Sequence, residues 1–372
     1  MAQFNFIGKI VPIKNTDKFK GYTEKTYDSG WMTQRLCFNL VAGDNRHMVE
    51  INAGRWKDDK KNGMVYTYSK AEEGEKSKPI QIAWDKRNDP EEIAKVAGNR
   101  IYTIDTDTYS HRKELEENGK DDELEISKKK CKHFITGTDF IEWANKVVNS
   151  EKIKNMTFRV RGNINYSYSE RTGQYYVVYE VQKIYRLDDD EKPTSEVNMN
   201  FFFTKDSMDS DSFDETGKAI VSGYTTFYDS MTKKSWFCPV SLAVRDNADK
   251  KKLATWERVF NKFEDDEVRK INLVCQKIDG AQKTDIRFED LDEDTQHYIN
   301  DGLISLKDAI KEAGGQMYGD RVRELRIVTL GRGSSKGSET TAYTVDDVMA
   351  KPHKEEPKST NDEVDIFEDS DI

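Results

Sequence analysis

The chain has 372 residues, which is enough for two ordinary domains. Charged residues make up 34% and hydrophobic residues 35%, and no run approaches the roughly eighteen apolar residues of a membrane span. Collagen, coiled-coil and membrane proteins are thereby excluded, and 11% aromatic residues exclude a wholly disordered chain. The four scattered cysteines (Cys37, Cys131, Cys238, Cys275) form no disulfide framework, so we expect a reducing, cytoplasmic location.

Negative charge is concentrated in two segments. Residues 345–372 carry a net charge of -7 and residues 188–215 carry -8, against -10 for the whole chain, so the remainder carries +5. A mildly basic body permits a groove for a phosphate backbone, which a uniformly acidic surface would repel.

The first half of the chain predicts three strands, a helix and two strands. The helix is indicated by Phe140, Trp143 and Val147 at i, i+3 and i+7, and it begins at Thr136 or Thr138. A long polar insertion, 54–135, separates it from the third strand. Alternating apolar residues place the strands at 4–11, 32–41, 46–53, 156–168 and 175–187.

The second half repeats this order. Leu253, Trp256 and Phe260 have the spacing of the first helix at an offset of 113 residues, and the helix begins at Asp246 or Asn247. Five matching apolar positions indicate a duplication; convergent packing of a helix followed by a strand is the alternative. The predicted strands are 197–203, 219–228, 236–244, 268–278 and 322–330, with an insertion at 280–318 that holds a helix near 301–312.

Five strands with a helix between the third and the fourth is the connectivity of the OB-fold, a five-stranded Greek-key barrel. We therefore predict a mainly β protein with minor α content: one OB-fold over 1–187, a second over 188–330, and a flexible linker with a disordered acidic tail over 331–372. Because the helix closes one end of such a barrel, we expect Trp143 and Trp256 to point into the core.

Aromatic residues alternate with Arg and Lys on the predicted strands, which is typical of proteins that hold single-stranded nucleic acid by base stacking and phosphate contacts. Tyrosine is also common in purely structural strands, so the set carries more weight than its members. The predicted nucleic-acid-binding residues are Trp31, Arg35, Arg46, Arg55, Trp56, Lys57, Arg159, Arg161, Tyr166, Tyr168, Arg171, Tyr224, Tyr228, Trp236 and Arg245.

The last twelve residues place six acids around Val364, Ile366, Phe367 and a terminal Ile372. A solubilising end needs no hydrophobic residue at its last position. We interpret the segment as a peptide ligand, in which acids steer toward a basic pocket and an apolar residue anchors.

No catalytic motif is found, and we expect neither an enzyme nor a cofactor. Two metal-dependent alternatives stay open. Cys131, His133 and His111 offer three zinc ligands without the usual paired spacing. Asp105 and Asp107 begin a two-metal carboxylate site of the kind that cleaves phosphodiesters.

With its strand–helix order in both halves and the segment from Asp362 to Ile372, the chain resembles phage-type single-stranded DNA-binding proteins. The resemblance implies sequence-nonspecific coating of single-stranded DNA during replication, recombination and repair, with partner proteins recruited by the tail. The family's docking residues fall on Phe367, Asp369, Asp371 and Ile372. The ending Asp-Ser-Asp-Ile departs from the Pro-Phe ending of the common bacterial form, and two barrels in one chain suit a monomer or homodimer.

Two questions stay open at this point. A scaffold whose barrels bind proteins of a replication or recombination complex, without touching DNA, is the alternative function. RNA in place of DNA is the alternative ligand, because recognition of the 2′-hydroxyl depends on geometry.

Overall fold

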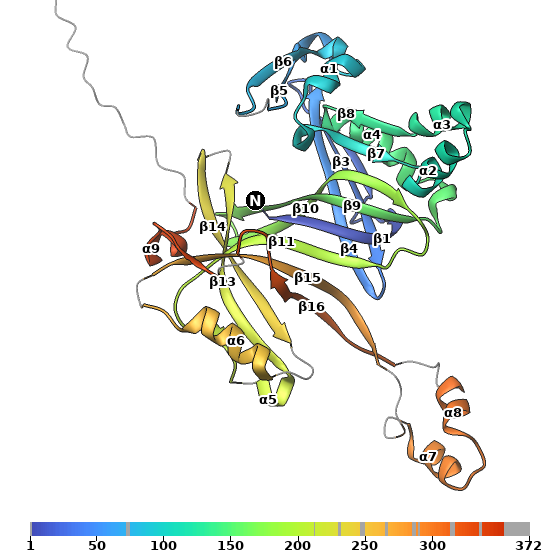
Figure 1. Cartoon of the computed structure of the whole chain (residues 1–372), viewed down its shortest axis with the longest axis vertical. Coiled ribbons are helices and arrows are strands. Elements are labelled where there is room, and N and C mark those ends of the chain that lie inside the picture. The colour runs from blue at the N-terminus through green and yellow to red at the C-terminus, as the bar shows by residue number, and fades with distance from the viewer. Residues whose placement is uncertain are drawn as a thin grey trace, which may run out of the picture.

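The computed structural model describes residues 2–71, 75–211, 213–229, 232–245, 250–264, 267–284, 288, 291–312, 317–334 and 337–352. The fold is mainly β (Figure 1). The first half contains β1 (Gln3–Pro12), β2 (Tyr22–Thr26), β3 (Trp31–Ala42), β4 (Asn45–Trp56), α4 (Gly137–Val148), β9 (Thr157–Ser169) and β10 (Gln174–Leu187). The second contains β11 (Thr194–Phe203), β12 (Met208–Asp209), α5 (Phe213–Thr216), β13 (Lys218–Asp229), β14 (Lys234–Arg245), α6 (Lys250–Asn261), β15 (Arg269–Thr284) and β16 (Met317–Leu330).

The strands predicted from apolar alternation are confirmed. Most ends agree within about three residues, whereas β15 continues to Thr284 and β16 begins at Met317, beyond the predicted ranges 268–278 and 322–330. In the first half their pairings close on themselves: β1 pairs with β3, β3 with β4, β4 with β10, β10 with β9, and β9 with β1. The β4–β10 pairing is parallel and the others are antiparallel. The alternating side chains that face inward, such as Leu36, Phe38 and Phe158, are buried.

The second half repeats the circuit with β11, β13, β14, β16 and β15 in the same roles. Its β14–β16 pairing is again the parallel one. The helix predicted near 301–312 corresponds to the shorter α8 (Leu306–Glu312), and a further helix, α7 (Glu293–Asn300), precedes it. Both helices lie beyond the far ends of β15 and β16 (Figure 1).

The two halves share one sheet and one core. β1 pairs antiparallel with β11, from Gln3 opposite Asn198 to Ile7 opposite Thr194, while its other edge pairs with β9. A single cluster of buried side chains runs from Ala2 through both halves to Cys275.

A second contact between the halves lies at the β3–β4 turn. A Cβ at Gly280 of β15 would fall 2.1 Å from the Asp44 carbonyl oxygen, so only glycine permits this close approach. Asn45 Oδ1 accepts a 3.0 Å hydrogen bond from the Asp279 amide. His47 Nε2 lies 2.6 Å from Ser195 Oγ, in the buried space between β4 and β11.

Helix α4 begins as predicted at Thr136, whose hydroxyl accepts from the Asp139 amide. Its apolar stripe buries Phe140, Ile141, Ala144, Val147 and Val148 against the first half. The prediction that Trp143 points into the core is wrong, because its side chain is 40% exposed. Trp256 of α6 is partly buried and stacks on Phe260 at 5.7 Å between ring centroids. The predicted start of α6, Asp246 or Asn247, lies outside the described residues.

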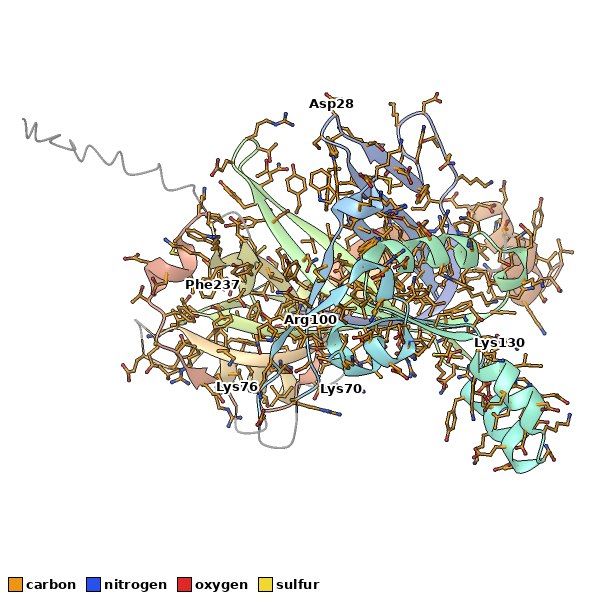
Figure 2. The ribbon with its side chains drawn as sticks, turned by 90° about the horizontal axis from the view of Figure 1, so that it is seen from above. Asp28, Lys70, Lys76, Arg100, Lys130 and Phe237 are labelled. Carbon is orange, nitrogen blue, oxygen red and sulfur yellow. The ribbon has the colours of Figure 1, made fainter. Side chains whose placement is uncertain are left out.

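The 54–135 insertion adds structure to the first half. Its elements are η1 (Asp59–Lys61), β5 (Met64–Tyr68), β6 (Pro79–Ala83), η2 (Trp84–Lys86), α1 (Pro90–Lys95), η3 (Gly98–Arg100), β7 (Tyr102–Asp105), α2 (Tyr109–Glu117), α3 (Asp121–Lys128) and β8 (Cys131–Phe134). β7 pairs parallel with the later part of β10 and extends the sheet. Seen from above, the α2–α3 pair projects from the body beyond Lys130 (Figure 2).

The Gly/Ser-rich segment predicted as a flexible linker is held against the second half. Gly331 N donates to the Asn272 carbonyl at 2.7 Å, and Asn272 N donates to Ser334 Oγ at 2.8 Å. Further on, β17 (Glu339–Thr340) pairs with the start of β15. Helix α9 (Val345–Met349) follows, and its capping box joins Thr344 and Asp347. We call residues 337–352 the C-terminal segment.

Candidate nucleic-acid interface

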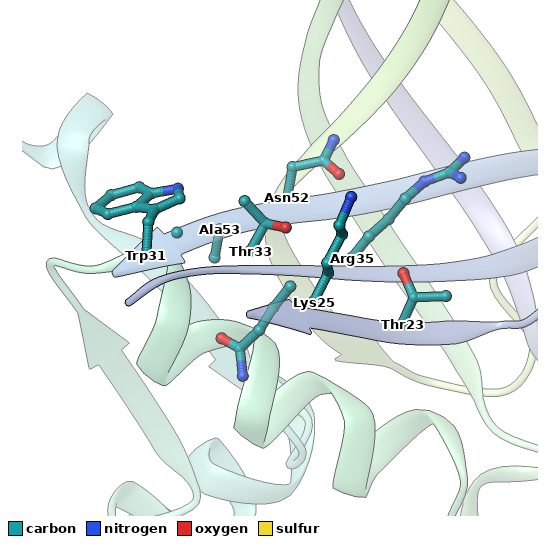
Figure 3. Close-up of a pocket in the computed structure, with 9 residues that line it drawn as sticks. Thr23, Lys25, Trp31, Thr33, Arg35, Asn52 and Ala53 are labelled. Atoms are coloured by element: carbon teal, nitrogen blue, oxygen red, sulfur yellow. The ribbon is translucent and has the colours of Figure 1, made fainter. Parts of the chain in front are cut away.

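The outward surface of β3 carries a shallow open face. Along this strand Met32, Gln34 and Leu36 are buried, so Trp31, Thr33 and Arg35 project on the opposite side (Figure 3). The hollow there has a volume of about 620 Å³. We call it the β3 face; its lining residues are Thr23, Lys25, Trp31, Thr33, Gln34, Arg35, Asn52, Ala53 and Gly54.

Two indole rings lie at one end of this face. A Cβ at Gly54 would fall 2.5 Å from Trp31 Cζ2, so the absent side chain is what lets the Trp31 ring lie against β4. Trp56, directly opposite Trp31 in the register, meets it edge to face at 5.3 Å and 80°. Lys61 Nζ lies 5.7 Å from the Trp56 ring centroid. Rings beside a cation are what a stacked base with its phosphate requires.

Cations line the rest of the face. Lys25 of β2 is exposed, and its Nζ lies 4.5 Å from the Tyr27 ring. Arg35 is 43% exposed, although its Nη2 bonds Glu50 Oε2 at 2.6 Å. Glu50 is nearly buried and also accepts from Asn52 at 2.6 Å. The Glu50 charge is therefore neutralised at the floor of the face and does not project from it.

A second carboxylate marks where the face ends. Glu180 of β10 stands opposite Glu50 in the parallel pairing, and its side chain accepts from Asn165. Burial raises the pKa of Glu180, and the charge of Glu50 raises it further. Glu180 therefore lies outside the β3 face, whose lining residues come from β2, β3 and β4.

The structure brings together some predicted residues of the first half and separates others. Trp31, Arg35 and Trp56 share the β3 face. Arg55 is a partner of Asp59 at 3.0 Å and of Glu142 at 3.8 Å. Lys57 and Arg46 are exposed near opposite ends of β4, and Arg171 is exposed in the β9–β10 turn.

The residues predicted on β9 do not reach the β3 face. Tyr166 is 7% exposed and belongs to the core, and burial raises its pKa well above the usual range. Tyr168 is partly buried against Tyr175, with ring centroids 4.9 Å apart. Arg161 is exposed, whereas Arg159 is half-buried with an Nε that has no hydrogen-bond partner among the described residues. Buried Tyr166 is a correction to the predicted site.

Sequence reasoning missed Lys25, Thr23 and Gly54. The alternation of Tyr22-Thr-Glu-Lys-Thr26 could have indicated the short strand β2. Gly54 carried no signal, because its role depends on the ring of a residue on the neighbouring strand.

The described residues of the second half do not present a matching open face at the equivalent position. Tyr224 packs on a cluster of Phe202, Phe237 and Val268, and the C-terminal segment covers it with Val345 and the buried Val348. Tyr343 meets the Phe237 ring at 5.0 Å and the Phe202 ring at 5.9 Å (Phe237 is labelled in Figure 2).

The other predicted residues of this half are mostly engaged. Trp236 packs against the core and its Nε1 donates to Thr232 Oγ1 at 2.9 Å. Arg245 bonds Glu324 at 2.9 Å. Tyr228 is 58% exposed. Of the three aromatic rings predicted in this half, only that of Tyr228 is largely exposed.

The candidate metal ligands are engaged with one another and with cations. Arg112 forms two hydrogen bonds to Asp105, at 2.6 and 2.7 Å. Although burial opposes it, hydrogen bonds from Lys130, Ser127 and His111 hold the pKa of Asp107 well below its usual range. Cys131 Sγ lies 3.7 Å from His133 Nε2, and His111 bonds Asp107 instead. Within the described ranges, no three His, Cys, Asp or Glu side chains are arranged to hold a metal ion.

The predicted docking residues Phe367, Asp369, Asp371 and Ile372 lie outside the described residues. Among the helices that are described, none combines the length and apolar character needed to cross a bilayer.

No protein-family model matches the sequence, and no curated protein matches it. Two solved structures of the single-stranded DNA binding protein from Thermus aquaticus, the wild type and a deletion mutant, are similar at 8% and 9% identity. Each alignment covers 75% of this chain, with 85% and 87% of the other chain, at a TM-score of 0.31.

Proposed function

We propose that the protein is a non-enzymatic, sequence-nonspecific single-stranded DNA-binding protein whose two halves are tandem OB-folds. The order of pairing supports the fold assignment: in each half, five strands form a closed circuit with one parallel contact, and a helix separates the third and fourth of them. OB-folds bind oligonucleotides on the face of their second and third strands. In the first half those strands are β3 and β4.

The β3 face is the observation that carries the proposal. Trp31 and Trp56 offer rings for stacking, and Lys25, Arg35 and Lys61 stand beside them for phosphates. Stacking on an aromatic ring contributes about 1–3 kcal/mol per base and tolerates any sequence. Because the C-terminal segment covers the equivalent face of the second half, the first half is the main binding unit.

The wider role follows from this activity and from the resemblance noted above. A phage-type protein of this kind coats single-stranded DNA during replication, recombination and repair in the cytoplasm of the host cell. Its acidic tail, through Phe367, Asp369, Asp371 and Ile372, recruits partner proteins, and the chain acts as a monomer or homodimer.

The test is a titration of fluorescein-labelled oligo(dT) by the full chain, followed by anisotropy at several salt concentrations. We expect tight binding that weakens linearly in a plot of log K against log salt, because phosphate contacts release counterions. Trp31→Ala should weaken binding about 5- to 150-fold, the equivalent of 1–3 kcal/mol. The matched control is Trp143→Ala, which removes an exposed indole on α4, outside the β3 face.

Absence of oligo(dT) binding at low salt would refute the proposal and favour the protein-binding scaffold. Equal losses from Trp31→Ala and Trp143→Ala would remove the β3 face from the site. A parallel titration with oligo(U) decides between DNA and RNA.

A further inference from the structure

A small pocket lies where β1 joins the two halves. Strand β1 lies between β9 and β11 (Figure 1) and contributes Gln3, Phe4 and Asn5 to the pocket lining. The pocket has a volume of about 170 Å³. Its lining residues are Gln3, Phe4, Asn5, Asn99, Arg161, Gly162, Gln182, Lys183, Glu196 and Asn198.

Two cations face each other in this pocket. Arg161 and Lys183 are directly paired across β9 and β10, which places their Cβ atoms about 5 Å apart on the same side of the sheet. Neither side chain has a hydrogen bond or ion pair to any described residue. Burial lowers the pKa of Lys183, and the charge of Arg161 lowers it further. Like charges directly opposite each other destabilise a sheet, so the pair is costly unless an anion lies between its members.

Amide side chains form most of the remaining lining, from Gln3, Asn5, Asn99, Gln182 and Asn198. The side-chain oxygen of Asn5 is buried without a partner. Because the oxygen and nitrogen of an amide exchange places on a half-turn, Asn5 can present a donor to an acceptor-rich group. Glu196 is the one carboxylate in the lining, and its Oε1 accepts from Asn198 at 2.7 Å. Two cations and several amide donors, with one acid already engaged, form a site for an oxyanion.

We infer that this pocket binds a phosphate group between Arg161 and Lys183. Where the phosphate belongs to single-stranded DNA, the inference rests on the proposed function and gives the bound strand a second contact, at the junction of the halves. An Arg and a Lys are the side chains that hold phosphates in proteins, the first by its planar fork and the second as a point charge.

The test uses Arg161→Gln, Lys183→Gln and the double variant of the full chain, with Lys9→Gln, an exposed lysine of β1, as the matched control. Thermal unfolding is measured in chloride and in inorganic phosphate at equal ionic strength. Phosphate should raise the melting temperature of the wild type and of Lys9→Gln and leave that of the double variant unchanged. In chloride the single variants should melt no lower than the wild type, since each relieves a like-charge contact, and this shows that they fold.

The oligo(dT) titration then identifies the source of the phosphate. If it belongs to DNA, the salt slope should fall by about 0.7 for each cation removed. Stabilisation by phosphate with an unchanged slope supports the pocket with a free phosphate or nucleotide as its ligand. No phosphate effect together with a slope equal to that of Lys9→Gln overturns the inference. Failure of the wild type to bind oligo(dT) refutes the proposed function alone, since the thermal measurement still decides the pocket.

Discussion

We predict that His47 makes the stability of the junction between the halves dependent on pH. Its ring lies against Phe6 at 4.5 Å between centroids, and its side chain is fully buried. Burial lowers the pKa of His47 from 6.5 to about 3; nearby Lys277 lowers it further and Asp279 opposes this. The folded protein therefore keeps a neutral ring at pH values where the unfolded chain takes up a proton.

The sign and size of the pH effect on the free energy of unfolding follow from the linkage between proton binding and folding. Because the folded-state pKa lies below the unfolded one, stability is full above pH 6.5 and is lost as the pH falls toward 3. The loss approaches about 1.4 kcal/mol per pH unit within that window, or about 2 kcal/mol between pH 7.5 and pH 5. His47→Gln, which can keep the hydrogen bond to Ser195, should remove this part of the pH dependence.

The assay is urea unfolding of the wild type and His47→Gln at pH 7.5 and pH 5, with His297→Gln as the control for an exposed histidine. The wild type should lose about 2 kcal/mol more than His47→Gln on acidification. Equal losses in the two proteins would show that His47 titrates as it does in water, and the argument for a closed junction would fail.

Three further outcomes are expected. Gly54→Ala should displace the Trp31 ring and weaken oligo(dT) binding about as much as Trp31→Ala. The control is Gly98→Ala, which should bind normally because the space around its Cβ position is open. Equal anisotropy curves for the two glycine variants would contradict this reasoning. Glu324→Gln should cost about 3 kcal/mol of stability, measured by thermal unfolding, because the carboxylate is nearly buried and bonds Lys218 at 3.3 Å, Arg245 at 2.9 Å and also Arg326. Deletion of residues 361–372 should preserve or strengthen oligo(dT) affinity and abolish partner recruitment, since an anionic tail competes for a basic groove; markedly weaker DNA binding would count against the proposed tail.

The helices and strands could be predicted from the sequence where the spacing of apolar residues determines which residues are buried. The strands and the two helices at their expected places follow from alternation and from the i, i+3, i+7 spacing. Trp143 shows the limit of the spacing rule. Viewed down the helix axis, successive residues are about 100° apart, so Ala144 and Val148 lie on one side of Phe140 and the buried stripe is centred on that side. Trp143 lies about 60° from Phe140 on the opposite side, away from that centre. Val147 still falls within the buried stripe, whereas Trp143 falls outside it and is exposed.

The site was predictable in part. Trp31, Arg35 and Trp56 were found because rings and cations alternate on one strand pair. The loss of Tyr224 from the surface depends on residues more than a hundred positions away, which no local pattern reports. One signal was available: Thr344-Val-Asp-Asp347 before Val348 has the form of a capping box, and it predicts a helix where composition alone suggested a linker.

The position of β1 has a consequence for how the chain is made. Its residues 3–7 pair on both edges, with β9 and with β11, about 150 to 200 positions further along. At about 5–20 residues per second, a ribosome needs on the order of ten seconds or more to deliver those partners. Until those partners are synthesised, both edges of β1 have unpaired backbone N–H and C=O groups. Unpaired edges of an apolar strand promote aggregation. Pairings between residues so far apart in the sequence slow folding. We therefore expect the unpaired β1 strand to be the part of the chain that chaperones protect and that N-terminal fusion tags disturb.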